Sequence, residues 1–186
     1  MDAHVGCVVF ATQLRVRVLA FDIAGTGESS VPMTGAGGGE IVRGLITHAR
    51  TLGDGVVAHV VVFGGPVEAA LTGEGPSQHG MHGIIGNALG FDAPPSPAER
   101  SARLAEFSLR PLLDQDHNAP MLVINGANDV HVPRHDTLVF QGRRDTVVDL
   151  IPDAGHSAPT KLPYVMATIA DWLTRTVRLI RSAPRA

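Results

Sequence analysis

The chain has 186 residues, of which 44% are hydrophobic and 18% charged, so it is long enough for one sizeable core and too apolar for global disorder. Its net charge of -3 comes from 15 basic and 18 acidic residues, and the basic ones are scattered apart from four arginines between Arg175 and Arg185 that fit a solvated helix face, which argues against a nucleic-acid partner. No run approaches the roughly 20 apolar residues of a membrane span, so we expect one domain over residues 1–186 that does not enter a membrane.

The cysteine content and the N-terminal sequence bear on the compartment. Cys7 is the only cysteine, so no internal disulfide can form. The first residues, Met-Asp-Ala-His, lack the basic start and apolar core of a signal peptide. We therefore expect a cytoplasmic protein.

Four runs of apolar and β-branched residues are typical of buried strands. They cover residues 16–22, 56–63, 121–125 and 146–151. The second run is almost entirely apolar, as in a central parallel strand that is buried on both faces. Segments of helical periodicity separate the strands, and this alternation predicts a mostly parallel sheet with helices on both faces, a three-layer α/β/α fold.

Helical periodicity is clearest in three segments. The first lies between Gly39 and Gly53 and should cover the sheet with one apolar face, made of Ile41, Leu45, Ile46 and Ala49. The second spans 98–113 as a single helix, with Leu109 and Leu112 on its apolar side, and the third closes the chain over 162–180. Residues 67–95 are rich in glycine and predict an irregular, lid-like excursion.

An acid follows the third predicted strand, in the loop Gly126-Ala-Asn-Asp-Val-His-Val-Pro133. Asp129 there can accept a hydrogen bond from an imidazole and fix its tautomer, or it can simply cap the next helix as a turn aspartate. His131 and His135, with Asp129 and Asp136, suggest a metal site. No standard ligand spacing is completed, so we expect no metal and place both histidines at the surface.

A histidine follows the fourth predicted strand, in the loop Asp153-Ala-Gly-His-Ser157. Gly155 lets the backbone turn sharply, so that the ring of His156 can point back over the edge of the sheet. Because the carboxyl ends of parallel strands meet at one edge, we expect His156 to lie near Asp129. A histidine oriented by a carboxylate can act as a general base.

The glycine-containing loop of residues 22–30 resembles a phosphate cradle only superficially. It lacks the third glycine of a dinucleotide fingerprint and the Gly-Lys-Ser/Thr of a P-loop. We therefore expect no nucleotide and no other cofactor, and we interpret the loop as a turn at the mouth of a site.

Three motifs taken together, VRVLAFDIAGTGES, MLVINGANDVHVP and IPDAGHSAPTKLPYVMATIADWL, resemble the α/β-hydrolase superfamily. Within it, the chain from Val16 onward is most similar to the branch of fermentation-respiration-switch esterases, polyketide-shortening hydrolases and pseudooxynicotine-type C–C hydrolases. The resemblance implies a small ester, thioester or β-diketone substrate. It also implies that Asp129 and His156 belong to a Ser-Asp-His triad.

The nucleophile of that triad has no counterpart, because no G-x-S-x-G pentapeptide occurs in the chain. Residues 53–67 look like the approach to the family's elbow strand joined to the end of the following strand. We expect the elbow strand, its helix and the earlier loop that supplies an oxyanion-hole N–H to be missing. The remaining hydroxyls and thiol that could approach His156 are Ser29, Ser30, Ser77, Ser157 and Cys7.

Two functions remain open from the sequence. His156 and Asp129 can act as a dyad on a small-molecule carbonyl substrate without a serine, or the chain can be a non-catalytic hydrolase-fold remnant that binds a small molecule. The missing elbow strand would also leave a gap beside the strand at 56–63. Either the sheet closes this gap or a second copy pairs with the exposed edge, and we expect a homo-oligomer.

Overall fold

The computed structural model describes residues 12, 30, 31, 33–35, 37–51, 59–72, 81–115 and 118–182, with the backbone alone for 81, 82 and 177–182. The predicted strand at 16–22 and the centre of the predicted excursion lie outside these residues, as do Cys7, Ser29 and Ser77. Among the described helices, none is long and apolar enough to cross a membrane.

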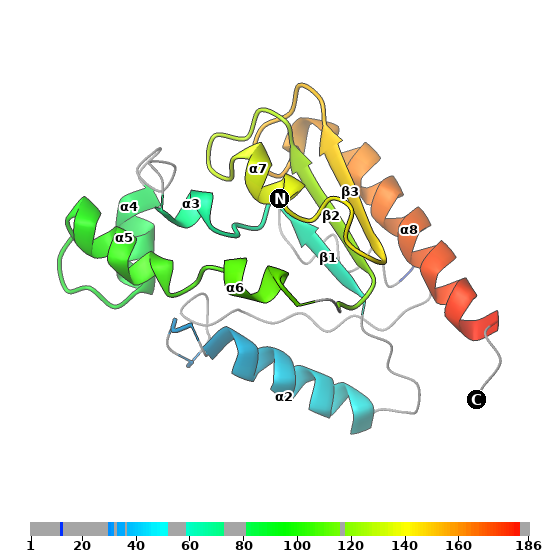
Figure 1. Ribbon diagram of the computed structural model, residues 1–186, viewed down its shortest axis with the longest axis horizontal. Coiled ribbons are helices and arrows are strands. Elements are labelled where there is room, and N and C mark those ends of the chain that lie inside the picture. Colours follow the sequence, from blue (N-terminus) through cyan, green and yellow to red (C-terminus); the bar gives the residue numbers. More distant parts are fainter. Residues whose placement is uncertain are drawn as a thin grey trace.

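A parallel sheet of three strands forms the centre of the described fold (Figure 1). Its strands, in spatial order, are β1 (Val60–Phe63), β2 (Met121–Gly126) and β3 (Thr146–Ile151). Met121 lies opposite Val60 on one side and Thr146 on the other, so the three carboxyl ends meet at one edge of the sheet. The predicted parallel sheet is confirmed.

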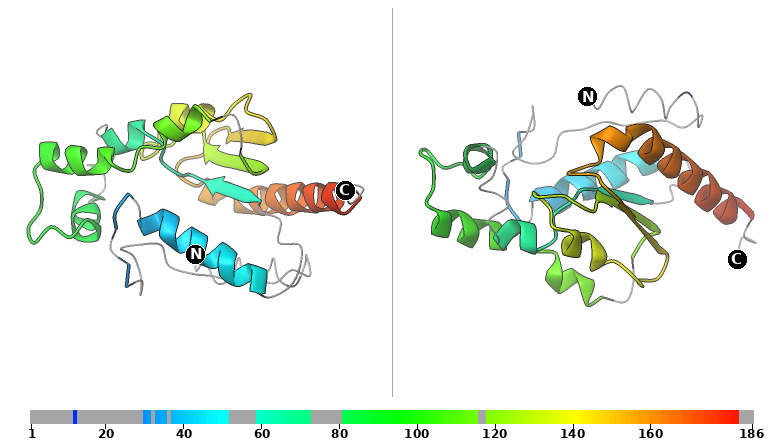
Figure 2. Two further views of the ribbon diagram at one scale, coloured as in Figure 1. Left: turned by 60° about the horizontal axis from the view of Figure 1, so that its bottom comes forward. Right: turned by 90° about the horizontal axis from the view of Figure 1, so that it is seen from above.

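Two helices cover opposite faces of this sheet (Figure 2), namely α7 (Arg134–Leu138) and α8 (Leu162–Ser182). Because successive side chains of a strand point to opposite faces, β2 serves both layers. Leu122 and Ile124 pack with the α8 side chains Val165, Ile169 and Trp172, whereas Val123 packs with Val67 and Phe140 on the α7 side. This arrangement confirms the three-layer α/β/α fold and the predicted closing helix.

The strands β1 and β2 differ in burial. In β2 every residue after Met121 is buried, as the apolar run at 121–125 predicted. In β1 no residue is buried, and Phe63 is 36% exposed. The prediction that this strand is buried on both faces is therefore wrong for residues 60–63, since β2 is its only paired neighbour within the described residues.

The predicted first helix is present as α2 (Gly37–Thr51). Its expected apolar face is half-buried rather than buried, and the only buried residue of the helix is Gly37. The helix was therefore predicted correctly, but its face contributes no fully buried side chain to the described core.

The predicted helix over 98–113 is wrong, because the chain forms α5 (Pro97–Ala105) and then a separate α6 (Arg110–Leu113). Ser96 and Glu99 form a capping box that starts α5. Pro111 has no backbone N–H to donate, so it fits the start of a new helix and not the interior of a long one. Leu109 and Leu112, expected on an apolar face, are 38% and 56% exposed.

Residues 67–95 are more helical than predicted. They include α3 (Ala69–Thr72) and α4 (Met81–Ala88), and these pack with α5 around a small apolar cluster of Leu71, Leu89 and Leu104. The irregular excursion is thus in part a helical subregion with its own packing, and its role as a lid stays a prediction. A short 3-10 helix, η2 (Pro159–Lys161), leads into α8.

Candidate active site

Asp129 is buried in the loop that follows β2, and its two carboxylate oxygens have different partners. Oδ1 accepts the backbone N–H of His131 at 2.8 Å and that of Val132 at 3.0 Å. These two bonds fold the loop around the carboxylate, whose side chain has no exposed surface. Oδ2 remains available to a partner from outside the loop.

The loop that follows β3 is fastened to this one through the backbone. Ala127 donates its N–H to Ile151 O and Asn128 donates to Ala154 O, both at 2.9 Å. Gly126 lies where the loops come closest, and a Cβ atom there would collide with the carbonyl oxygens of Ala154 and Gly155. Only glycine fits at this position, and the close approach sets where His156 stands.

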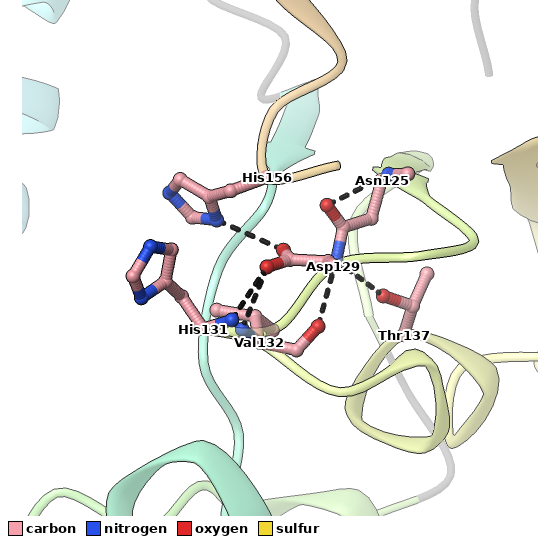
Figure 3. A network of polar contacts seen from close by, with 7 residues as sticks. Asn125, Asp129, His131, Val132, Thr137 and His156 are labelled. Carbon is pink, nitrogen blue, oxygen red and sulfur yellow. Dashed lines mark hydrogen bonds and ion pairs between the residues drawn. The ribbon is translucent and has the colours of Figure 1, made fainter. Parts of the chain in front are cut away.

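His156 and Asp129 meet as predicted, with His156 Nδ1 at 2.8 Å from Asp129 Oδ2 (Figure 3). An ionised carboxylate can only accept hydrogen bonds, so Nδ1 carries the proton and Nε2 keeps a free lone pair. The side chain of His156 is 43% exposed, whereas that of Asp129 is fully covered. The pair is therefore a buried acid that orients an imidazole open to solvent.

Hydrogen bonding keeps Asp129 ionised despite its burial. Burial alone would raise the pKa of Asp129. Bonds from the backbone N–H of Val132, the ring of His156, the backbone N–H of His131 and the side chain of Asn125 outweigh burial, so the pKa of Asp129 is lowered from its ordinary value. The ionised carboxylate can thus accept the Nδ1–H of His156 at neutral pH.

His131 belongs to this cluster, contrary to the predicted surface position. It is half-buried, and its ring lies against that of His156 with centroids 5.4 Å apart and planes at 83° (Figure 3). His135 is exposed on α7, as predicted. A surface position was predicted for both histidines, but only His131 is close enough to Asp129 in sequence to take part in its turn.

The other side of His156 faces the chain that leaves β1. Gly64 has φ +63°, and an added Cβ would lie 2.8 Å from Ser157 Oγ and 3.1 Å from His156 Cε1. Ser157 and Ala158 also have positive φ, 55° and 39°, a costly conformation for residues other than glycine. The imidazole therefore lies close to both Gly64 and His131, on a turn that includes residues with positive φ.

The structure places two of the five nucleophile candidates among its described residues. Ser30 is exposed, and the hydroxyl of Ser157 faces Gly64. Ser157 lies within the loop between β3 and η2, and not on a tight turn that leads directly from a strand into a helix, as an elbow serine would. The nucleophile of a serine hydrolase thus has no counterpart in the described part of the chain.

Asp136 has a structural role in place of the metal-binding role considered for it. Its carboxylate, in a residue only 2% exposed, accepts the backbone N–H groups of the segment that begins α3, namely Val67, Glu68, Ala69 and Ala70. These bonds satisfy the free N–H groups at a helix start. Among the described residues there is no group of three or more His, Cys, Asp or Glu side chains that could hold a metal ion.

Asn125 was missed in the sequence although it supports the site. It is fully buried near the end of β2 and donates from Nδ2 to Val132 O at 3.1 Å and to Thr137 Oγ1 at 3.4 Å. Its Oδ1 accepts the N–H of Gly126 at 2.8 Å. One signal was available, since an amide within the apolar run Met-Leu-Val-Ile-Asn must find buried partners.

A cavity of about 610 Å³ lies elsewhere, between α2 and the segment that joins α5 to α6. Its apolar lining includes Met33, Ile41, Val42, Phe107, Leu109 and Leu112. None of the lining residues belongs to the loops of Asp129 and His156. Its size falls within the range of small-molecule pockets.

No family model matches the sequence, and no curated protein is significantly similar to it. Solved structures do match. AbyA5 superposes with a TM-score of 0.63 at 16% identity, over 82% of this chain and 53% of its own, so the chain spans about half the length of AbyA5.

Two further solved structures cover more of their own length. A thermophilic esterase from Thermogutta terrifontis has a TM-score of 0.51 at 19% identity, over 83% of this chain and 78% of its own. A hydrolase from Pseudomonas aeruginosa PA01 has a TM-score of 0.51 at 24% identity, over 90% and 85%. These likenesses confirm the predicted α/β-hydrolase-like fold.

Proposed function

We propose that the chain is an enzyme in which His156, oriented by Asp129, acts as a general base on a small carbonyl substrate such as an ester, a thioester or a β-diketone. The observation that supports this most is the 2.8 Å contact between His156 Nδ1 and a carboxylate without exposed surface. It leaves Nε2 of a partly exposed ring as the acceptor of a proton. Proteins of similar fold that are called an esterase and a hydrolase support a hydrolytic reaction in general terms.

Water serves as the nucleophile in this proposal, since an elbow serine is missing from the sequence. His156 Nε2 takes a proton from a water molecule while the water oxygen adds to the carbonyl carbon. The tetrahedral intermediate then collapses, the bond to the leaving group breaks, and the imidazolium returns its proton to that group. Asp129 stays ionised and stabilises the imidazolium in between.

The test compares purified protein with single variants on p-nitrophenyl acetate and 2,4-pentanedione. We expect turnover by the unchanged chain and by His135→Ala, which alters an exposed histidine on α7. His156→Ala should lose about 10²- to 10⁴-fold, the usual contribution of a general base. Equal activity in His156→Ala and the unchanged chain would reject the proposal.

A binding protein without turnover is the second candidate, and the 610 Å³ apolar cavity favours it because its lining is separate from the dyad. Binding of an apolar probe that is weakened by Leu112→Glu, but unaffected by His156→Ala, would support this function. Hydrolysis that depends on His156 would instead support the first.

We also propose a homo-oligomer in which the edge of β1 pairs with a second copy. Within the described residues β2 is the only strand that pairs with β1, and Phe63 is 36% exposed. An unpaired strand edge favours association. Sedimentation should then show a dimer or larger assembly at micromolar concentration, and a monomer at all concentrations would contradict the proposal.

A further inference from the structure

We propose that His131 is a positioning residue whose ring holds the imidazole of His156 in the conformation that faces Asp129. Its contribution to turnover rests on the proposed function, whereas its effect on the conformation of His156 does not. The resemblance to hydrolases assigns nothing to this position, and the role follows from the contacts of the ring in this chain.

The backbone of His131 is fixed by the same carboxylate that orients His156. Its N–H donates to Asp129 Oδ1 at 2.8 Å, while His156 Nδ1 contacts Oδ2 of the same group at 2.8 Å. The two residues are therefore tied to opposite oxygens of one buried carboxylate. The side chain of residue 131 consequently starts beside the imidazole, whatever its chemical type.

The ring of His131 uses this position to support His156. The centroids are 5.4 Å apart and the planes meet at 83°, which is the edge-to-face geometry that aromatic pairs prefer. In Figure 3 the ring of His131 extends from the loop of Asp129 and the ring of His156 from the loop after β3, and the two rings lie beside each other. The contact thus supports the ring of His156, whose side chain remains 43% exposed.

His156 needs such support because a single hydrogen bond does not fix an exposed ring. Its side chain is 43% exposed, so water competes with Asp129 for Nδ1–H. Gly64 limits movement on the β1 side, where an added Cβ would lie 3.1 Å from Cε1. The ring of His131 supplies a second contact, and without it the imidazole can turn away from the carboxylate more easily.

The proposal is tested by the tautomer of His156 in the full-length chain. Nitrogen-15 shifts of the ring, detected through its carbon-bound protons at about pH 8.5 where imidazoles are neutral, give the ratio of Nδ1–H to Nε2–H forms. The resonance is assigned by its loss in His156→Gln. In His131→Ala the ratio should fall about 2- to 13-fold, the range expected for one aromatic pair.

Matched variants separate the ring from the backbone. His131→Phe keeps an edge-to-face ring and should retain the ratio, whereas His131→Leu fills space without a ring and should lower it like His131→Ala. All three keep the backbone N–H that bonds to Asp129. His135→Ala, on exposed α7, should have no effect. If His131→Ala disturbs the amide spectrum, the comparison of the Leu and Phe variants decides.

An unchanged ratio in His131→Leu, or an equal fall in His131→Phe, would overturn the proposal. If the chain hydrolyses esters, His131→Leu should also lower kcat by the same factor, leave KM unchanged, and be rescued by His131→Phe. If the chain has no hydrolase activity, the proposed function fails. The tautomer ratio still decides the role of His131 in that case, so the two failures are distinguishable.

Discussion

The loop of Asp129 and the helix α7 that follows it each bury one aspartate, and they use it in opposite ways. Counted with their backbone atoms, Asp129 and Asp136 are 8% and 2% exposed. Both carboxylate oxygens of Asp136 accept hydrogen bonds from backbone N–H groups of the segment that begins α3. In Asp129 one oxygen accepts from the backbone of its own loop, and the other contacts a partly exposed imidazole. Burial of an acid therefore does not by itself mark a catalytic group, and the solvent access of its partner distinguishes the two environments.

The two environments follow from what each carboxylate must neutralise. A helix start presents several free N–H groups and a partial positive charge, so an anion there is satisfied by the backbone alone. Asp136, which lies on α7 much later in the chain, caps the start of the short α3 in this way. The turn at Asp129 offers only two close backbone donors, and the remaining oxygen needs a side chain. This difference makes one aspartate structural and leaves the other able to serve chemistry.

The largest effect should be a loss of turnover when the carboxylate of Asp129 is replaced by an amide. Asp129→Asn should lower kcat on p-nitrophenyl acetate by about 10²- to 10⁴-fold, because the amide no longer holds the Nδ1–H tautomer of His156. Combining it with His156→Ala should cost little more, since the two residues act as a unit. The control is Asp92→Asn, an exposed aspartate after α4. Full activity in Asp129→Asn would assign the dyad to structure alone.

The second largest effect should be a loss of stability when Asp136 is replaced. Asp136→Ala leaves four backbone N–H groups without their acceptor, so urea denaturation should show a loss of about 2 to 4 kcal/mol in the free energy of unfolding. Asp136→Asn keeps one acceptor oxygen and should lose less. Well below the unfolding transition, turnover per folded molecule should stay near that of the unchanged chain. A loss below about 0.5 kcal/mol, as at a surface site, would contradict this role.

The role of one of these aspartates could be predicted from the sequence, and that of the other could not. The Asp129–His156 pair could be predicted because both residues follow apolar strands whose carboxyl ends must meet in a parallel sheet. The role of Asp136 could not be, since its partners lie 66 to 69 positions earlier in the chain and no local pattern connects them. The place of His131 was missed for another reason, because its ring direction depends on the turn that Asp129 forms.

For the fold too, local sequence patterns predicted some elements and missed others. The apolar run of β2 and the periodicity of α8 predicted their positions well, because burial alone decides them. The break between α5 and α6 was missed because leucines on both sides continue the helical spacing, although Pro111 marked a new start. The half-buried face of α2 was also beyond local patterns, since amphipathicity predicts a buried face but not how closely it is covered.

A smaller effect should come from Asn125, which connects the two aspartate environments. Asn125→Ala removes the buried amide between Val132 O and Thr137 Oγ1, so the free energy of unfolding should fall by about 1 to 2 kcal/mol. The loop of Asp129 should loosen more than α7, which is measured by faster amide hydrogen exchange at Val132 than at Asp136. Asn87→Ala, at an exposed position of α4, is the control. Equal changes at the two amides would mean that Asn125 supports both regions alike.

The smallest effect should be the pH dependence that Asp129 adds to stability. Because hydrogen bonds lower its pKa in the folded chain, the unfolded chain binds a proton there more readily. The stabilisation is therefore complete above the ordinary aspartate pKa of about 3.9, and it is lost as pH falls through the lower folded-state pKa. Asp129→Asn cannot titrate at this position. The difference in unfolding free energy between the unchanged chain and this variant, measured by urea denaturation from pH 6 to pH 3, should shift toward the variant only below about pH 4. A difference that is constant over this range would mean that the hydrogen bonds around Asp129 do not favour its ionised form.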